Sequence, residues 1–240
     1  MAWEFGNRFA YYLRDATSRI AMVKNTLEAD SIRLSYNNRL ILSDISIRCE
    51  TGSVTGILGR NGCGKSTLLQ IIFGSTVTQD GIIRINGVKA QPAFKQPWRV
   101  ALLPQFPFLP PGLTLHKAFG AFELNVSDFT ERVPQFRGLE YEQIGELSYG
   151  MSRLAEIFLL IKKESMFVLL DEPFSALPPV AREQVQEWIE EERNKKGFII
   201  SDHDYDSVLR ICDRLYLLRD GKTWICRGRD DLAAGGYLPE

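Results

Sequence analysis

Nine consecutive residues have the types and the spacing that bind the phosphates of a nucleoside triphosphate. In chain order they are Gly59, Arg60, Asn61, Gly62, Cys63, Gly64, Lys65, Ser66 and Thr67. The glycines let the backbone curl until its N–H groups point inward at phosphate oxygens. Lys65 can reach the β- and γ-phosphates, and the Ser66 hydroxyl is placed to ligate Mg²⁺. An apolar run at 54–58 precedes this phosphate loop and an apolar helical pattern follows it, which is the setting that the loop requires.

A pair of carboxylates follows a second apolar run further along the chain. Residues 167–173 read Phe-Val-Leu-Leu-Asp-Glu-Pro, and a wholly apolar run is typical of a strand buried on both faces of a parallel sheet. Asp171 can hold Mg²⁺, directly or through water, and Glu172 can polarise the water that attacks the γ-phosphate. Acidic pairs at strand ends also cap helices, so this motif gains its specificity from the phosphate loop upstream.

The composition indicates a globular intracellular protein. A chain of 240 residues is long enough for one large α/β domain, or for a core with a subdomain. Lys and Arg number 29 against 30 for Asp and Glu, so there is no basic excess and we expect no nucleic-acid partner. The apolar stretches are shorter than the roughly 18 residues of a membrane span, and we find no secretory signal. The 4 cysteines are scattered, which favours a reducing cytosol over a zinc site or a disulfide framework.

Hydrophobic periodicity predicts the elements that position these motifs. We expect strands at 31–36, 40–49, 53–58, 82–85, 98–103, 167–170, 198–201, 215–218 and 222–226. We expect helical structure over 114–163, 180–195 and 205–212. The pattern predicts a core built on the phosphate loop, with an antiparallel β layer at its start and a helical insertion at about 106–164.

Residues 1–27 are predicted to be an N-terminal extension to a domain that occupies 28–240. A weak helical pattern in the extension would place Phe9, Tyr12, Leu13, Ala16 and Ile20 on one apolar stripe. Such a stripe could pack on the core, or contact a membrane surface or a partner. A loosely held tail is the alternative.

With these motifs in this order, the chain from about residue 28 to 228 resembles the ATP-binding cassette (ABC) ATPases. Residues 147–151 read Leu-Ser-Tyr-Gly-Met and stand at the place of the family's LSGGQ signature. The resemblance implies an α/β fold, namely a P-loop NTPase (RecA-like) core with an N-terminal antiparallel β layer and a helical subdomain insertion. It also implies Mg²⁺-dependent hydrolysis of ATP.

The resemblance assigns roles to further residues. Gln105 matches the glutamine that senses Mg²⁺ and water, and His203 matches the switch histidine that contacts the γ-phosphate and supports Glu172. Ser148 and Gly150 match signature residues that face the γ-phosphate bound by the other subunit of a dimer. Tyr36 matches the aromatic that stacks on adenine, although an ordinary strand aromatic is the alternative reading.

Two departures from the family pattern concern turnover. Tyr149 and Met151 stand where the signature usually has Gly and Gln, and Pro178 replaces an aspartate that helps to couple the two ATP sites of a dimer. Both changes leave the nucleotide-binding residues intact. We therefore expect an active but slow ATPase.

The favoured function is the ATPase subunit of an ABC transporter, which pairs with a second ABC ATPase subunit in a homo- or heterodimer. It would drive a separate transmembrane permease subunit from the cytoplasmic face of a membrane. A soluble ABC ATPase of DNA repair or translation is disfavoured, because long coiled-coil insertions, tandem cassettes and basic patches are missing. A degenerate regulatory cassette is supported only by the departures, and a GTPase is disfavoured because no NKxD motif occurs.

Two local expectations follow from the sequence around the motifs. Phe106, Phe108 and Leu109 lie among prolines, and we expect them to form an exposed apolar patch that docks the membrane subunit. The alternative is that these side chains fold back onto the helical subdomain. Cys63 stands beside Lys65 and a helix N-terminus, which predicts a lowered thiol pKa.

Overall fold

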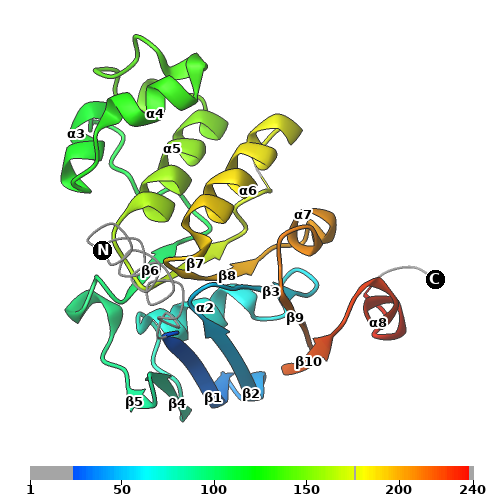
Figure 1. Cartoon of the computed structure of the whole chain (residues 1–240). Coiled ribbons are helices and arrows are strands. Elements are labelled where there is room, and N and C mark those ends of the chain that lie inside the picture. Colours follow the sequence, from blue (N-terminus) through cyan, green and yellow to red (C-terminus); the bar gives the residue numbers. More distant parts are fainter. Residues whose placement is uncertain (1–23, 176, 238–240) are drawn as a thin grey trace, which may run out of the picture.

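The computed structural model describes residues 24–175 and 177–237. A six-stranded sheet with the order β10-β9-β3-β8-β7-β6 crosses the molecule (Figure 1). The parallel strands are β3 (Val54–Leu58), β6 (Val100–Leu103), β7 (Phe167–Asp171), β8 (Gly197–Ser201) and β9 (Arg214–Arg219). The antiparallel strand β10 (Lys222–Cys226) closes one edge. Strands β7 and β8 are buried at every position, as their apolar runs predict.

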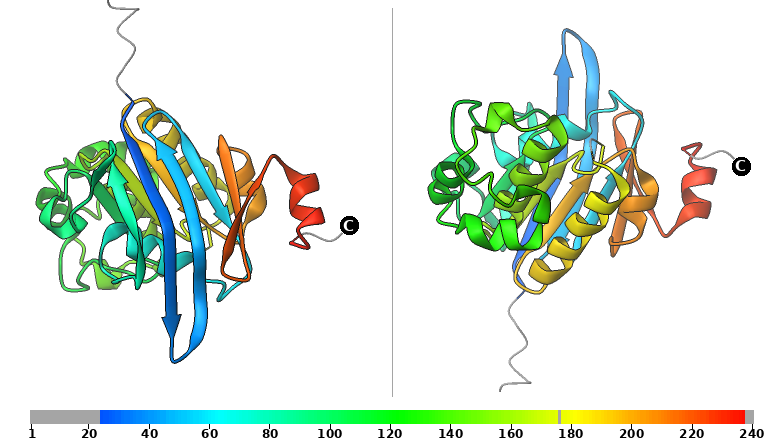
Figure 2. Two further views of the ribbon diagram at one scale, coloured as in Figure 1. Left: turned by 90° about the horizontal axis from the view of Figure 1, so that it is seen from below. Right: turned by 90° about the horizontal axis from the view of Figure 1, so that it is seen from above.

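A second sheet is antiparallel and packs below the first (Figures 1 and 2). Its order is β2-β1-β4-β5, from β1 (Thr26–Tyr36), β2 (Arg39–Glu50), β4 (Asp80–Ile85) and β5 (Val88–Lys89). The expected start of β1 at residue 31 is wrong. Ser31 has φ of 55° and the pairing with β2 shifts between Ala29 and Ile32, so a β-bulge interrupts the alternation there.

The first strand also corrects the predicted domain boundary. The predicted N-terminal extension includes residues 26 and 27, which are the first residues of β1. Residues 1–23, with the apolar stripe from Phe9 to Ile20, lie outside the described residues.

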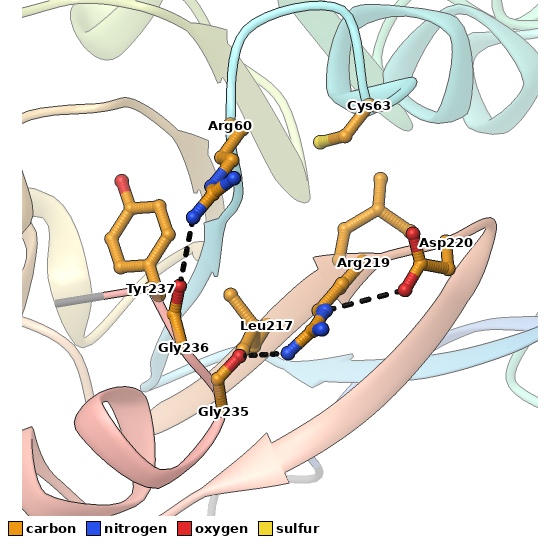
Figure 3. A pocket seen from close by; sticks show the side chains of 9 residues that line it. Arg60, Cys63, Leu217, Arg219, Asp220, Gly235, Gly236 and Tyr237 are labelled. Atoms are coloured by element: carbon orange, nitrogen blue, oxygen red, sulfur yellow. Dashed lines mark hydrogen bonds and ion pairs between the residues drawn. The ribbon is translucent and has the colours of Figure 1, made fainter.

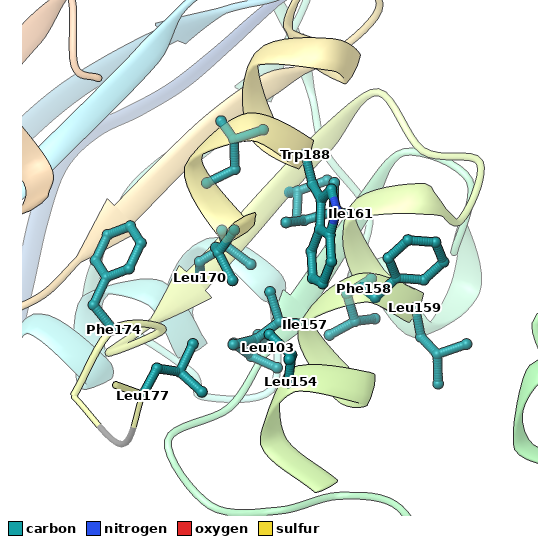
Figure 4. Close-up of a cluster of buried hydrophobic side chains, with 14 of the residues drawn as sticks. Leu103, Leu154, Ile157, Phe158, Leu159, Ile161, Leu170, Phe174, Leu177 and Trp188 are labelled. Carbon is teal, nitrogen blue, oxygen red and sulfur yellow. The ribbon is translucent and has the colours of Figure 1, made fainter. Parts of the chain in front are cut away.

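Helices fill the space on both sides of the six-stranded sheet. Between the two sheets lies α2 (Lys65–Phe73), whose Leu68 and Leu69 are fully buried. On the other face α5 (Tyr149–Lys162) and α6 (Pro179–Arg193) pack together, and Figure 4 shows their side chains against those of the strands. The rings of Phe158 and Trp188 meet edge to face at 4.9 Å. Helix α5 is buried continuously from Ser152 to Ile161, so it forms the centre of this layer.

The predicted helical insertion is present but is interrupted. It contains α3 (Leu115–Ala121) and α4 (Val126–Arg132), and single turns at Pro134–Phe136 and Ile144–Glu146 before α5. A cluster of fully buried aromatics holds these pieces together, with Phe129 at 5.1 Å from Phe119 and 4.5 Å from Phe136. Short helices of this kind are stabilised by tertiary packing rather than by their own propensity.

Other predicted boundaries need correction near exposed positions. Strand β6 begins at Val100 rather than residue 98, where Trp98 is 53% exposed. Helix α7 (Tyr205–Leu209) ends three residues earlier than expected, and a short turn at Ala93–Lys95 and α8 (Arg229–Ala234) were not predicted. Within residues 24–175 and 177–237, every helix falls short of the length and apolar character that a membrane crossing needs.

Candidate active site

Four neighbouring parallel strands deliver the predicted site residues to one edge of the sheet. The phosphate loop follows β3, His203 follows β8, Asp171 ends β7, and Gln105 follows β6. The pairing aligns Asp171 with Ser201 and Leu103 with Leu170, so the carboxyl ends of the strands lie level. Ligands of open α/β sheets bind outside these carboxyl ends.

The phosphate loop has the backbone that its glycines predict. Gly62 and Gly64 have φ of +78° and +107°, a region that L side chains rarely adopt. A Cβ on Gly59 would lie 2.5 Å from the carbonyl oxygen of Leu218, so only glycine allows this approach to β9. The buried Lys65 donates from Nζ to the carbonyl oxygen of Gly59 at 2.8 Å. Its ammonium group therefore lies within the curl of the loop, at the N-terminus of α2.

Asp171 is a buried carboxylate beside hydroxyl groups. It is 2% exposed, and Ser201 Oγ donates to its Oδ1 at 2.6 Å. Burial raises the pKa of Asp171, while hydrogen bonds from Ser201 and Ser66 act in the opposite direction. The predicted metal ligands Ser66 and Asp171 thus lie next to each other, and hard oxygen donors of this kind fit Mg²⁺.

Glu172 is the meeting point of the predicted catalytic residues. Its backbone is strained, with φ of 49°, and its side chain is 14% exposed. Gln105 Nε2 donates to Glu172 Oε2 at 3.2 Å, and His203 Nδ1 lies 3.8 Å from the same oxygen. The structure therefore brings Gln105, Glu172 and His203 together.

Asp202 organises the loop that carries His203, and sequence reasoning missed it. Its fully buried carboxylate accepts the N–H groups of His203 at 2.7 Å and Asp204 at 2.9 Å through Oδ1. Oδ2 accepts the N–H of Phe174 at 3.0 Å, which joins this loop to the segment after Glu172. Burial raises the pKa of Asp202, against these hydrogen bonds. An aspartate directly after a buried strand is a sequence signal for a carboxylate that accepts hydrogen bonds from the N–H groups of the following turn.

Residues 235–237 form a C-terminal segment that lies against the phosphate loop (Figure 3). The sequence did not predict this contact. Arg60 Nη2 donates to the carbonyl oxygen of Gly236 at 3.1 Å, and the Tyr237 hydroxyl donates to that of His203 at 3.3 Å. Cys63 borders a cavity of about 200 Å³ between this segment and β9. The predicted lowering of the Cys63 pKa is wrong, because burial raises it and the opposing effect of Lys65 is smaller.

The signature residues lie apart from this group, at the start of α5. Ser148 caps the helix by accepting the N–H of Met151 at 3.3 Å, and it is exposed, while Gly150 is half-buried. Among residues 24–175 and 177–237, no hydrogen bond joins them to the phosphate loop. Tyr36 is 52% exposed at the end of β1. The neighbouring β2 approaches the loop, since a Cβ on Gly64 would lie 3.0 Å from Leu42.

The expected apolar patch in the segment after Gln105 is smaller than predicted. Phe106 is 75% exposed, but Leu109 is only 7% exposed and Phe108 is half-buried. The Phe108 ring lies 6.1 Å from that of Phe122 in the helical insertion. Two of the three side chains therefore fold back, and Phe106 alone presents a large apolar surface.

Comparison with known proteins agrees with this geometry. The family model described as "ABC transporter" matches residues 42–175. The lipopolysaccharide export system ATP-binding protein LptB of Acidithiobacillus ferridurans is 31% identical over 218 residues, covering 82% of this chain and 88% of that protein. The manganese transport system ATP-binding protein MntA of Synechocystis sp. is 30% identical over 223 residues, covering 85% of each.

Solved structures show the same fold. The ATP-binding subunit of an ABC transporter superposes with a TM-score of 0.72 at 25% identity, over 89% of this chain and 95% of that chain. A nucleotide-free ATP-binding cassette gives a TM-score of 0.74 at 22% identity, over 90% and 96% of the two chains. The α/β fold predicted from the motifs is confirmed. The chain therefore belongs to the ABC transporter family, as an ATPase subunit that energises transport.

Proposed function

We propose that ATP hydrolysis by this subunit depends on Mg²⁺ and uses Glu172 as the general base. The observation that carries the proposal is the convergence of Gln105 and His203 on Glu172 Oε2, at 3.2 Å and 3.8 Å. A base held by two polar partners next to a phosphate loop is arranged to accept a proton from an attacking water.

Ser66 and Asp171 supply the oxygen atoms that would hold Mg²⁺, with the side-chain oxygen of Gln105 as a third donor. The buried Asp171 carboxylate supports this assignment, because burial raises its pKa and a cation would offset the cost of keeping it charged. A bound ion would supply positive charge that offsets the negative charge of the phosphates.

The remaining residues of the loop bind and orient the nucleotide. Lys65 and the N–H groups between Gly62 and Thr67 would contact the phosphates, and Tyr36 offers its exposed ring to the adenine. Glu172 takes the proton of the water, while Gln105 and His203 fix the orientation of its carboxylate. Charge that develops on the γ-phosphate faces Lys65 and His203.

The test compares two variants with the wild type. Glu172→Gln should bind ATP with unchanged affinity and lose about 10²–10⁴-fold in kcat, because an amide cannot accept the proton. Lys65→Ala should lose ATP binding itself, because the phosphates lose a charge-assisted contact. Binding is measured with a fluorescent ATP analogue and turnover by phosphate release. A Glu172→Gln protein with wild-type turnover would exclude Glu172 as the base.

The exposed Ser148 and the half-buried Gly150 at the start of α5 support a two-subunit assembly. We propose that Ser148 and Gly150 contact the γ-phosphate held by a second ABC ATPase subunit, since a hydroxyl and an uncovered helix N-terminus suit an anion. The membrane partner is a permease subunit that docks at the segment after Gln105, where Phe106 is exposed. We therefore propose that the protein acts peripherally, at the cytoplasmic face of a membrane.

A further inference from the structure

Helix α5 carries a charged pair inside an apolar layer. Arg153 and Glu156 stand one turn apart, and their side chains are 2% and 0% exposed. Arg153 Nη1 lies 3.3 Å from Glu156 Oε2. Replacing a buried ion pair by apolar side chains is often neutral or stabilising, so stability alone does not account for the pair.

The pair makes contacts that reach both sides of the catalytic site. Glu156 Oε1 accepts the N–H groups of Phe108 at 2.7 Å and Leu109 at 3.0 Å, in the segment that begins at Gln105. Arg153 Nη2 donates to the carbonyl oxygen of Asp171 at 3.0 Å. That carbonyl belongs to the peptide bond that leads into Glu172.

These contacts close a ring with the hydrogen bond between Gln105 and Glu172. On one side, Glu172 bonds Gln105, and the segment that follows Gln105 is bonded by Glu156. On the other side, Arg153 bonds the peptide group that precedes Glu172. Both sides meet within a single turn of α5, the helix that begins directly after Ser148. Figure 1 shows how α5 lies over the strands β6 and β7 that carry the two catalytic segments.

We propose that Arg153 and Glu156 are positioning residues that hold Gln105 against Glu172, and that α5 transmits its own position to the catalytic base through them. The proposal rests on the proposed role of Glu172. Glu172 has a left-handed φ of 49°, and such backbone persists only where its surroundings fix it. Arg153 fixes the peptide on one side of that residue, and Glu156 fixes the segment whose Gln105 bonds its side chain.

The test replaces the pair by apolar side chains of similar size, in the double variant Arg153→Met/Glu156→Leu. The control is Arg132→Met/Glu191→Leu, which removes an exposed pair joined at 2.8 Å between α4 and α6. We expect at least a tenfold loss of kcat for ATP in the first variant, with KM within threefold of the wild type. The control should keep both constants.

Two further readouts separate positioning from a general loss of structure. The amides of residues 108 and 109 should exchange with solvent at least tenfold faster in Arg153→Met/Glu156→Leu, while those of α2 and β7 keep their protection. In a Glu172→Gln background the pair substitution should cause no further loss of kcat, because both act through the same carboxylate. A folded pair variant with wild-type kcat would overturn the proposal, as would independent losses in the combined variant.

A second variant decides the matter if the double variant does not fold. Glu156→Gln keeps one carbonyl oxygen for the two N–H groups but weakens the contact with Arg153, and we expect a threefold or larger loss of kcat with unchanged KM. An unchanged kcat overturns the proposal. Turnover of the wild type and of Glu172→Gln in the same assay tests the proposed function separately. If Glu172→Gln is inactive and the pair variants are fully active, only the positioning role fails, whereas wild-type turnover in Glu172→Gln overturns both.

Discussion

Lys65, Asp171 and Glu172, charged side chains at the candidate site, each form a hydrogen bond with a neighbouring group. Lys65 donates to a loop carbonyl, Asp171 accepts from Ser201, and Glu172 accepts from Gln105. For Cys63 the surroundings also decide, because burial raises the pKa of the thiol by more than the nearby ammonium group of Lys65 lowers it. Sequence neighbours alone therefore do not determine the reactivity of a residue in the phosphate loop.

Cys63 provides a prediction with a defined pH dependence. The reactive form is the thiolate, and burial raises the pKa of Cys63 above its ordinary value of 9.0. Inactivation by a maleimide should therefore be slow at pH 7 and accelerate by about tenfold per pH unit through pH 9. Saturating ATP should protect the enzyme, because the modified side chain and the phosphates compete for the same loop.

The control for this experiment is Cys63→Ala, which should resist the reagent at every pH. Cys49 is fully buried and burial raises the pKa of Cys212 to about 11, so neither should react first. Rapid inactivation at pH 7, or equal inactivation of Cys63→Ala, would show that the pKa direction or the site of attack is wrong.

At the scale of elements, loops from distant parts of the chain are tied to one another by single hydrogen bonds. Asp202 joins the loop after β8 to the segment after β7, through the N–H of Phe174. The segment after α8 joins the loop after β8 to the phosphate loop, through Tyr237 and Arg60. These contacts restrict the positions of the loops relative to one another.

The hydroxyl of Tyr237 gives a test at this scale. Tyr237→Phe removes the hydroxyl group and with it the hydrogen bond to the carbonyl oxygen of His203. An exposed hydrogen bond contributes about 0.5–1.5 kcal/mol, which corresponds to about a two- to tenfold loss of kcat if it holds His203 in place. KM for ATP should not change. The matched control is Tyr141→Phe, in a side chain that is 76% exposed in the helical insertion. Equal kcat values for both variants and the wild type would show that the segment does not support His203.

At the scale of the whole fold, residues 24–175 and 177–237 form two sheets with α2 between them and a helical layer on the outer face (Figure 2). Helix α5 belongs to the helical layer, yet its buried residues also pack on the main sheet (Figure 4). The helical insertion and the strands that carry the candidate catalytic residues therefore share one packed interior, and such interiors resist compression.

Substitution of the exposed Phe106 would test the proposed docking to a membrane subunit. Phe106→Asp should leave ATP binding and the melting temperature unchanged, because the side chain is 75% exposed and makes little contact with the core. It should release the protein from membranes and abolish transport, because a charge replaces an apolar contact. Fractionation and a transport assay measure the two effects. The matched control is Val180→Asp, at a position on α6 that is 70% exposed. Membrane association that survives in Phe106→Asp would place the docking surface elsewhere.

The sequence alone predicted which residues form the candidate site, because each motif consists of neighbouring residues. The conformation of the phosphate loop depends on Gly62 and Gly64, and its charge on Lys65 next to them. Apolar runs that end in polar residues identified the strand ends that carry Asp171 and His203. The predicted strand boundaries were wrong where a bulge or an exposed aromatic side chain interrupted the alternation of buried and exposed residues, as at Ser31 and Trp98.

Only the tertiary structure decided which residues meet, because strand order and burial depend on packing between distant segments. Gln105 and Glu172 are 67 positions apart and come within hydrogen-bond distance since β6 and β7 are neighbours. Leu109 turns inward because the buried Glu156 accepts its N–H group. No periodicity encodes such contacts, since each requires the complete sheet and the helix that covers it.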